Sequence, residues 1–175
     1  MSTVTYIYID QQALIVRELF TNVLGAKPRA RKAIGHLLGV ALHKNIISNH
    51  GFLSGFRVLT DLVPDNAVDI PLIWQYIGEI LGAFVGGSSP NMSLLKPILQ
   101  MVPAEKSQAL FKYIIKFAIE ISPKSHIQKF WQSSDFSLND LFKSDSINST
   151  FANEFNWLSE IIPTTTPPLK ENRVI

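Results

Sequence analysis

The sequence predicts an all-α fold of stacked antiparallel helical hairpins, of the HEAT-like kind. Apolar residues recur at intervals of three and four positions along most of the chain, which is typical of helices that bury one face. The segments between these runs are short, which favours consecutive antiparallel helices. No convincing internal repeat accompanies the pattern, so the prediction depends on periodicity and loop length.

The composition excludes several classes of protein. With 175 residues, 46% of them hydrophobic, the chain is long enough for one domain with a substantial core, and its net charge of +2 is too small to indicate wholesale nucleic-acid binding. The absence of cysteine excludes disulfide scaffolds, cysteine nucleophiles and thiolate metal sites. No apolar stretch approaches the roughly 20 residues that span a bilayer, and the first residues lack a secretory signal pattern. We therefore expect a cytoplasmic protein without membrane association.

Residues 1–10 are expected to be irregular or weakly helical. Their alternation, Thr3-Val4-Thr5-Tyr6-Ile7-Tyr8-Ile9, is typical of a strand, but a lone strand has nothing to pair with. The helical domain is predicted to span residues 11–162. After Pro163, the run Thr-Thr-Thr-Pro-Pro cannot continue a helix, so residues 163–175 are predicted to form a disordered tail.

Helical spacing recurs within the domain, at residues 34–42, 52–63, 70–84, 110–121 and 127–131. Pro103 and Pro123 bracket the run at 110–121. Ser137 and Asp140 have the spacing of a capping box that opens a brief helix. Residues 147–161 predict one or two closing helices. Short punctuating segments separate these elements, at residues 25–28, 45–51, 86–91 and 144–148.

The most informative segment is the acidic connector, which we define as residues 64–71. Pro64 predicts that the preceding helix ends near Val63, because proline disfavours helix at the residue before it. Pro71 suits the first turn of the next helix, where its missing N–H costs nothing. The connector is thus expected to be a stiff turn between two helices.

Two carboxylates, Asp65 and Asp69, lie on this turn. A rigid acidic loop is a candidate docking point for a basic partner. For Asp69 a purely structural interpretation is equally open, since its carboxylate could cap the free N–H groups of the following helix. Asp65 has no such explanation, because no helix start follows it directly.

Other candidate sites have simpler interpretations. His36, His43 and His50 recur every seven residues, but two helical turns separate the first pair by about 10 Å, too far for one metal ion. The basic cluster at residues 27–32 lies at a helix start, where it is either a solvated helix end or a site for a phosphate or an acidic partner. Gly86-Gly87-Ser88-Ser89 is a linker, because no strand precedes it and no suitably placed lysine follows.

The aromatic and reactive side chains give no sign of catalysis. Trp74, Trp131 and Trp157 lie in helical patterns and are expected in the core or in hairpin seams. No Ser-His-Asp spacing resembles a nucleophile elbow, and the acidic residues form no obvious catalytic pair. We expect no enzymatic activity, no metal and no cofactor.

A family resemblance begins in the acidic connector. The run Val63-Pro64-Asp65-Asn66-Ala67-Val68-Asp69-Ile70-Pro71, with the Trp74, Tyr76 and Glu79-Ile80-Leu81 that follow, resembles the signature loop and helix of the MI (MA-3) domain. The copy it resembles is that of the eukaryotic translation initiation factor 4 gamma family, the scaffold of the cap-binding complex. Further similar segments extend the resemblance from about Leu14 to Glu160, namely residues 33–42, 90–95, 123–131, 137–138 and 148–153.

The resemblance implies a protein-binding module in translation initiation. In this family the MI domain contacts a DEAD-box RNA helicase, translation initiation factor 4A, and its acidic loop docks on the helicase's N-terminal RecA-like domain. Transferred to this sequence, the contact carboxylates are Asp65 and Asp69. The implied module is monomeric, modulates the helicase in mRNA recruitment, and meets mRNA only indirectly or weakly.

Two departures limit the transfer. The family domain begins with an additional amphipathic helix that pairs with the region matching Leu14–Leu24, and residues 1–10 do not match it, so the first hairpin is expected to be incomplete. Either another segment covers the apolar side chains of this region, or the chain is a fragment with exposed apolar surface. Second, no acidic-aromatic HEAT domain and no cap-binding-protein motif follow, so we do not expect a complete scaffold.

Two alternatives remain open at this point. An MI-domain translational repressor would use the same loop to sequester the helicase, although such repressors typically carry two copies of the domain. A helical-repeat adaptor without helicase binding would keep the fold and lose the docking function.

Overall fold

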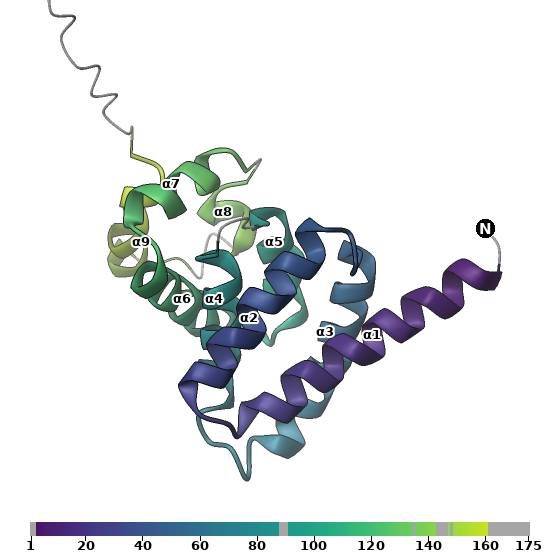
Figure 1. The fold of residues 1–175 in the computed structure, drawn as a ribbon. Helices are drawn as coiled ribbons and strands as arrows, with labels where there is room; N and C mark the ends of the chain where they lie inside the picture. The colour runs from purple at the N-terminus through teal and green to yellow at the C-terminus, as the bar shows by residue number, and fades with distance from the viewer. Residues whose placement is uncertain (1–2, 88–90, 135, 143–146, 148, 161–175) are drawn as a thin grey trace, which may run out of the picture.

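The computed structural model describes residues 3–87, 91–134, 136–142, 147 and 149–160, and the described part of the chain is all-helical, without strands (Figure 1). Its main helices are α1 (Thr3–Leu24), α2 (Pro28–His43), α3 (Asn49–Asn66), α4 (Ile73–Val85) and α6 (Ala104–Ile121). Shorter elements are η1 (Met92–Leu94), α5 (Leu95–Met101), α7 (Lys124–Gln132), α8 (Leu138–Leu141), α9 (Ser149–Phe155) and η3 (Asn156–Leu158). The predicted fold class, stacked helices without strands, is confirmed.

The long helices pack side by side in layers. α1 lies along α3, while α4 lies between α2 and α6, and the short helices α7–α9 gather at the C-terminal end of the stack (Figure 1). One continuous apolar core runs through these layers, from Val16 of α1 to Leu158 of η3. No helix within the described residues is both long and apolar enough to cross a membrane.

Of the two alternatives for residues 1–10, irregular or weakly helical, the structure has the helical one from Thr3 onward, because α1 begins at Thr3 and continues to Leu24. The strand-like alternation of these residues is outweighed by the helix that follows, because no glycine or proline interrupts the chain before Gly25 and the helix can extend through them. Ordinary residues differ by less than about 0.7 kcal/mol in helix propensity, so an established helix extends readily through them. The hydroxyl of Tyr8 donates a hydrogen bond of 3.1 Å to the carbonyl of Ile46, which ties the start of α1 to the loop after α2.

The apolar stripe of α1 is covered by α3, so another segment of the chain packs on most of this region. Val16 and Phe20 are fully buried, and the Phe20 ring makes an edge contact with Phe56 at 5.8 Å. Leu14 and Ile15 are each 50% exposed on the outer side of the helix. The predicted tail at residues 163–175 lies outside the described residues.

Glycines set the spacing of the long helices. A Cβ atom built on Gly55 of α3 would lie 2.7 Å from the Cβ of Val16 in α1, and one built on Gly35 of α2 would lie 2.7 Å from the Cβ of Ala83 in α4. Separations below 3.0 Å do not occur between real Cβ atoms, so alanine at either position would push the helices apart. The backbones of neighbouring helices therefore approach one another directly.

A buried polar link joins α1 to the start of α3. The amide oxygen of Gln12, a residue only 3% exposed, accepts hydrogen bonds from the backbone N–H of Ser48 at 2.9 Å and from its hydroxyl at 2.8 Å. The same hydroxyl accepts a hydrogen bond of 3.0 Å from the N–H of Gly51 and so caps α3. The Gln12–Ser48 link thus fixes the beginning of the helix that ends in the acidic connector.

Candidate partner-binding site

The acidic connector differs from its prediction at both ends. α3 does not end at Val63 but runs through Pro64 to Asn66, and α4 begins at Ile73 rather than at Pro71. Pro64 lies in the last turn of α3. The backbone hydrogen bond that proline cannot donate is lost there, but the helix ends two residues later, so no following turn is disrupted. The side-chain amide of Asn66 donates to the carbonyl of Leu62 at 2.8 Å, which strengthens this last turn.

Backbone hydrogen bonds hold the connector in one shape. The N–H of Ala67 donates to Val63 O at 2.8 Å, and the N–H groups of Asp69 and Ile70 both donate to Asn66 O, at 3.2 and 2.9 Å. The side chains of Ala67 and Ile70 pack against the core, so the turn is also anchored from below. The connector is therefore a braced turn, as predicted, although its helix boundaries lie elsewhere.

Asp65 and Asp69 both point into solvent. Each is exposed, and neither carboxylate makes a hydrogen bond or ion pair with any described residue. The capping interpretation of Asp69 is wrong, because the N-cap position of α4 is Leu72 and no side chain caps this helix. The turn from Ile70 to Ile73 delays the start of α4 beyond the reach of Asp69.

A third carboxylate, Asp61, was missed by the sequence analysis. It is exposed on α3 one turn before Asp65, and the two residues share a helix face about 6 Å apart along the axis. The sequence signal was that Asp61 and Asp65 are four residues apart, which places them on one face of a helix. That signal could not be used while α3 was expected to end at Val63, before Asp65. Because α3 continues, Asp61, Asp65 and Asp69 form one acidic series.

Exposed apolar side chains flank this series. Val68 is 81% exposed at the tip of the turn and Leu72 is 50% exposed, while Leu62 of α3 is 38% exposed. We call the three carboxylates and these three apolar residues the acidic face. Its combination of unpaired charge and exposed apolar surface is typical of a protein-binding site.

The basic cluster at residues 27–32 is not a solvated helix end as a whole, because Arg31 is buried. Its Nε donates to Glu79 Oε2 of α4 at 2.7 Å, and the two residues are only 4% and 3% exposed. Another guanidinium nitrogen donates to the carbonyls of Leu24 and Ala26, and the guanidinium stacks on the Tyr76 ring at 3.9 Å. The role of Arg31 is therefore structural. Its hydrogen bonds satisfy backbone carbonyls at the end of α1, and its ion pair with Glu79 joins α2 to α4.

The remaining cations of the cluster are at the surface. Lys32 forms an ion pair of 3.1 Å with Glu120 of α6, while Lys27 and Arg29 are exposed. His36 and His43 are also exposed, and no group of three or more metal-ligating side chains comes together among the described residues. Of the tryptophans, Trp131 is buried, and Trp74 and Trp157 are half-buried against the core.

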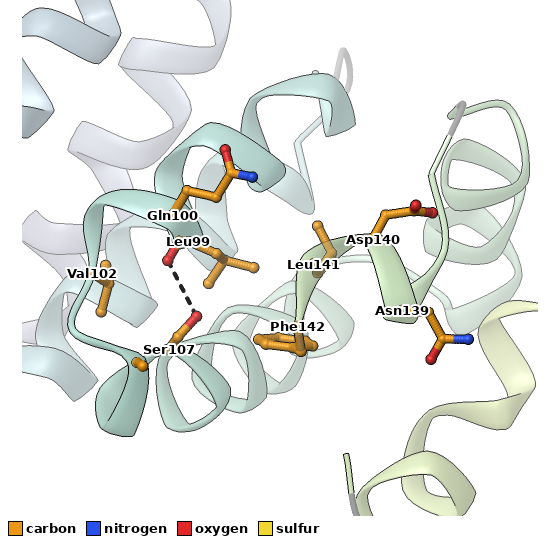
Figure 2. Close-up of a pocket in the computed structure, with 9 residues that line it drawn as sticks. Leu99, Gln100, Val102, Ser107, Asn139, Asp140, Leu141 and Phe142 are labelled. Atoms are coloured by element: carbon orange, nitrogen blue, oxygen red, sulfur yellow. Dashed lines mark hydrogen bonds between the residues drawn. The ribbon is translucent and has the colours of Figure 1, made fainter. Parts of the chain in front are cut away.

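A cleft of about 480 Å³ opens between α5, the start of α6 and α8 (Figure 2). Two of its polar side chains, Ser107 and Asp140, are already engaged in hydrogen bonds within the chain. The Ser107 hydroxyl donates to the carbonyl of Leu99 at 3.2 Å, and the Asp140 carboxylate, which Figure 2 shows directed away from Ser107, accepts from the N–H and hydroxyl of Ser137. These hydrogen bonds, the backbone one first, hold the pKa of Asp140 below its ordinary value. The predicted capping box is present, and the cleft contains no nucleophile paired with a base.

Comparison with known proteins agrees with the resemblance read from the sequence. Residues 7–88 match the MA3 domain family, and this range includes the whole acidic face. The chain is 26% identical over 112 residues to mouse eukaryotic translation initiation factor 4 gamma 3, covering 63% of this chain and 7% of the relative. It is 24% identical over 129 residues to the human protein of the same name, covering 73% of this chain and 8% of the relative.

The chain thus spans less than a tenth of the length of these curated relatives. The matched range begins in α1 and ends just after α4, so it includes the α1–α3 and α2–α4 pairs. Residues 7–88 therefore resemble an MA3 domain, and the chain is similar to a eukaryotic translation initiation factor.

Proposed function

We propose that this chain is a scaffold module of translation initiation that binds a DEAD-box RNA helicase, factor 4A, through Asp65 and Asp69 and modulates its activity in mRNA recruitment. The observation that carries the proposal is the state of these two carboxylates. Asp65, in the last turn of α3, and Asp69, on the braced turn that follows, are both exposed, and neither is paired with another described residue. The proposed place of action is the cytoplasm, where mRNA is recruited for translation.

The physics of the turn favours this role. A carboxylate held on a turn with internal hydrogen bonds loses little conformational freedom when it pairs with an arginine or lysine. No intramolecular ion pair of Asp65 or Asp69 with a described residue has to be broken first. Such charges mainly set the association rate and the orientation of the complex. Affinity is supplied in addition by apolar contacts, for which Val68 and Leu72 are available.

Asp61 extends the proposed contact. It lies one turn up α3 from Asp65, so a partner that reaches along the helix would meet three carboxylates in series. A module of this kind changes the helicase only if it binds one arrangement of the two helicase lobes more tightly than the other. Scaffolding and modulation are thus two consequences of the same contact.

Charge reversal of both connector residues tests the proposal. We expect Asp65→Lys with Asp69→Lys to reduce affinity for factor 4A at least tenfold, about 1.4 kcal/mol, measured by biolayer interferometry against the purified helicase. Asp10→Lys with Glu105→Lys is the matched control, because both residues are exposed and the change in net charge is the same. Far-UV circular dichroism should be unchanged in both variants. Unaltered binding of the connector variant would remove the proposal.

A helicase assay separates the scaffold from the repressor. RNA unwinding by factor 4A that is stimulated or unchanged by the chain agrees with a scaffold, while inhibition identifies a repressor. Complete absence of binding by the unmodified chain would leave a helical adaptor without a helicase partner. Asp61→Lys alone should give an intermediate loss of affinity if the contact extends along α3.

A further inference from the structure

A second surface groove lies far along the chain from the acidic face. It is formed by α6, the first residue of α7 and the α9–η3 segment, and encloses about 360 Å³. Its rim carries Lys112, Lys116 and Lys124, and its apolar walls include Ile119, Phe155 and Trp157. None of these elements takes part in the acidic connector.

The groove carries an excess of positive charge. Glu154 is the carboxylate among its lining residues, and it pairs with Lys112 at 2.5 Å. Lys116 and Lys124 have no carboxylate partner among the described residues. Their ammonium groups lie instead near aromatic rings, at 5.5 Å from Phe117 and 5.2 Å from Trp157. Because both lysines line the groove, two charges without a carboxylate partner among the described residues lie at its rim, and they favour an anionic ligand.

The interior of the groove is apolar. Ile115 and Phe155 are buried, and Ile119 and Trp157 are half-buried and pack against the core. A volume of this size admits one bulky side chain but not a folded element. Apolar walls below a basic rim match a ligand that is itself apolar at its centre and acidic at its flanks.

These features favour a peptide over single-stranded RNA. RNA binding in such a groove depends on bases that stack on open aromatic faces. Of the three aromatic residues that line the groove, Phe155 is buried and Tyr113 is half-buried, and the ammonium of Lys124 lies over the ring of Trp157. An aliphatic or aromatic side chain needs no free ring face, since it is held by burial against Ile119 and its neighbours.

We propose that this groove binds a linear peptide motif of a partner protein, in which a bulky apolar residue is flanked by aspartate or glutamate. The apolar residue enters between α6 and η3, and the flanking carboxylates pair with Lys116 and Lys124. Because the acidic face lies on α3 and the α3–α4 connector, the two sites can be occupied by different partners at the same time.

The test selects the ligand from a displayed random peptide library and needs no prior identification of the partner. We expect selected peptides to share an apolar residue flanked by acidic residues. A synthetic peptide of the selected sequence should bind at least tenfold more weakly when its acidic residues are replaced by their amides. It should lose a similar factor with the Lys116→Glu, Lys124→Glu variant, measured by fluorescence anisotropy.

Three controls make the result decisive. Lys27→Glu with Arg29→Glu changes two exposed cations elsewhere by the same charge and should leave peptide affinity unchanged. Ile119→Ala should weaken binding through the apolar wall, with the fold checked by circular dichroism. Asp65→Lys with Asp69→Lys should keep peptide binding, so failure at one site is distinguishable from failure at the other. The proposal is overturned by peptides without acidic residues, by binding that ignores the lysine changes, or by labelled oligouridylate binding to these lysines in place of peptide.

Discussion

The two halves of the molecule are held together in different ways. In the N-terminal half, α1 packs on α3 and α2 on α4 through glycines such as Gly55 and Gly35, so that backbone meets backbone. In the C-terminal half α6 still meets α4 closely at Gly78 and Gly82, but the short helices that follow α6 pack through a cluster of aromatic rings. The ring of Phe111 in α6 lies 5.9 Å from Trp131 and 5.0 Å from Phe155, and it also contacts Phe142 and Phe151.

The two kinds of packing suit the different lengths of the helices in each half. Long helices in backbone contact can take few other positions, and the acidic connector depends on that fixed placement of α3 and α4. The short helices α7, α8 and α9, of nine, four and seven residues, are marginal by themselves and need tertiary packing. Large rings provide that packing without requiring long matched helix faces.

The aromatic half should respond most strongly to loss of its central ring. We expect Phe111→Ala to lower the free energy of unfolding by about 3–5 kcal/mol, because the ring is fully buried among four others. Hydrogen exchange should then accelerate in α7 and α9 more than in α1 and α3. Uniform acceleration along the chain would contradict the division into two halves.

The N-terminal half should respond strongly to loss of its buried ion pair. Arg31→Met leaves Glu79 buried without its cation and should cost about 3 kcal/mol in urea denaturation. Arg31→Met combined with Glu79→Leu removes the unpaired charge and should recover most of that loss. If the double variant is as unstable as the single one, the pair acts through packing and hydrogen bonding to the end of α1 instead.

Two glycines give a matched comparison within the N-terminal half. Gly55→Ala should destabilise by about 1–3 kcal/mol, since its Cβ would overlap the backbone and side chains of α1. Gly39→Ala in α2 places its Cβ in ordinary contact with Phe84, at 3.5 Å, and should be neutral or stabilising because alanine favours helix. Thermal unfolding of the two variants measures the contrast.

The smallest expected effect is the response of α8 to acid. The pKa of Asp140 is lowered in the folded chain from 3.8 by hydrogen bonds from Ser137. Its contribution to stability is therefore fully present above the unfolded pKa and is lost as pH falls through the folded pKa. The amide resonance of Ser137 should titrate below pH 3.8, and Asp140→Asn should abolish that titration. A midpoint at or above 3.8 would show that the capping box does not form in solution.

Much of the fold could be predicted from the spacing of apolar residues. The run at 110–121 lies in α6, and the prolines that bracket it occupy N-cap positions, Pro103 for α6 and Pro123 for α7. The start of α1 was not predictable in this way, since Thr3–Ile9 has strand-like alternation and only continuity with the following helix overrides it. The alternation of apolar residues within a short segment favours one secondary structure, but it does not take account of an adjoining helix that can extend into the segment.

The candidate site was only partly predictable for a related reason. Asp65 and Asp69 were found from the connector sequence, but Asp61 was hidden by the expectation that Pro64 ends the helix. Arg31 was read as part of an exposed cluster, because its partner Glu79 is 48 residues away in the chain. Pairings of that kind depend on how α2 meets α4, which no local spacing reveals.

The Gln12–Ser48 link has a consequence for how the chain folds. The two residues are 36 positions apart, yet their contact completes the first turn of the helix that carries Asp61 and Asp65 at its other end. The Ser48 cap of α3 is local, but its support by Gln12 forms only once the N-terminal helix has docked, a step slowed by the closure of a long loop. We therefore expect a nascent chain to display the partner surface in its final placement only after both helices have emerged and met.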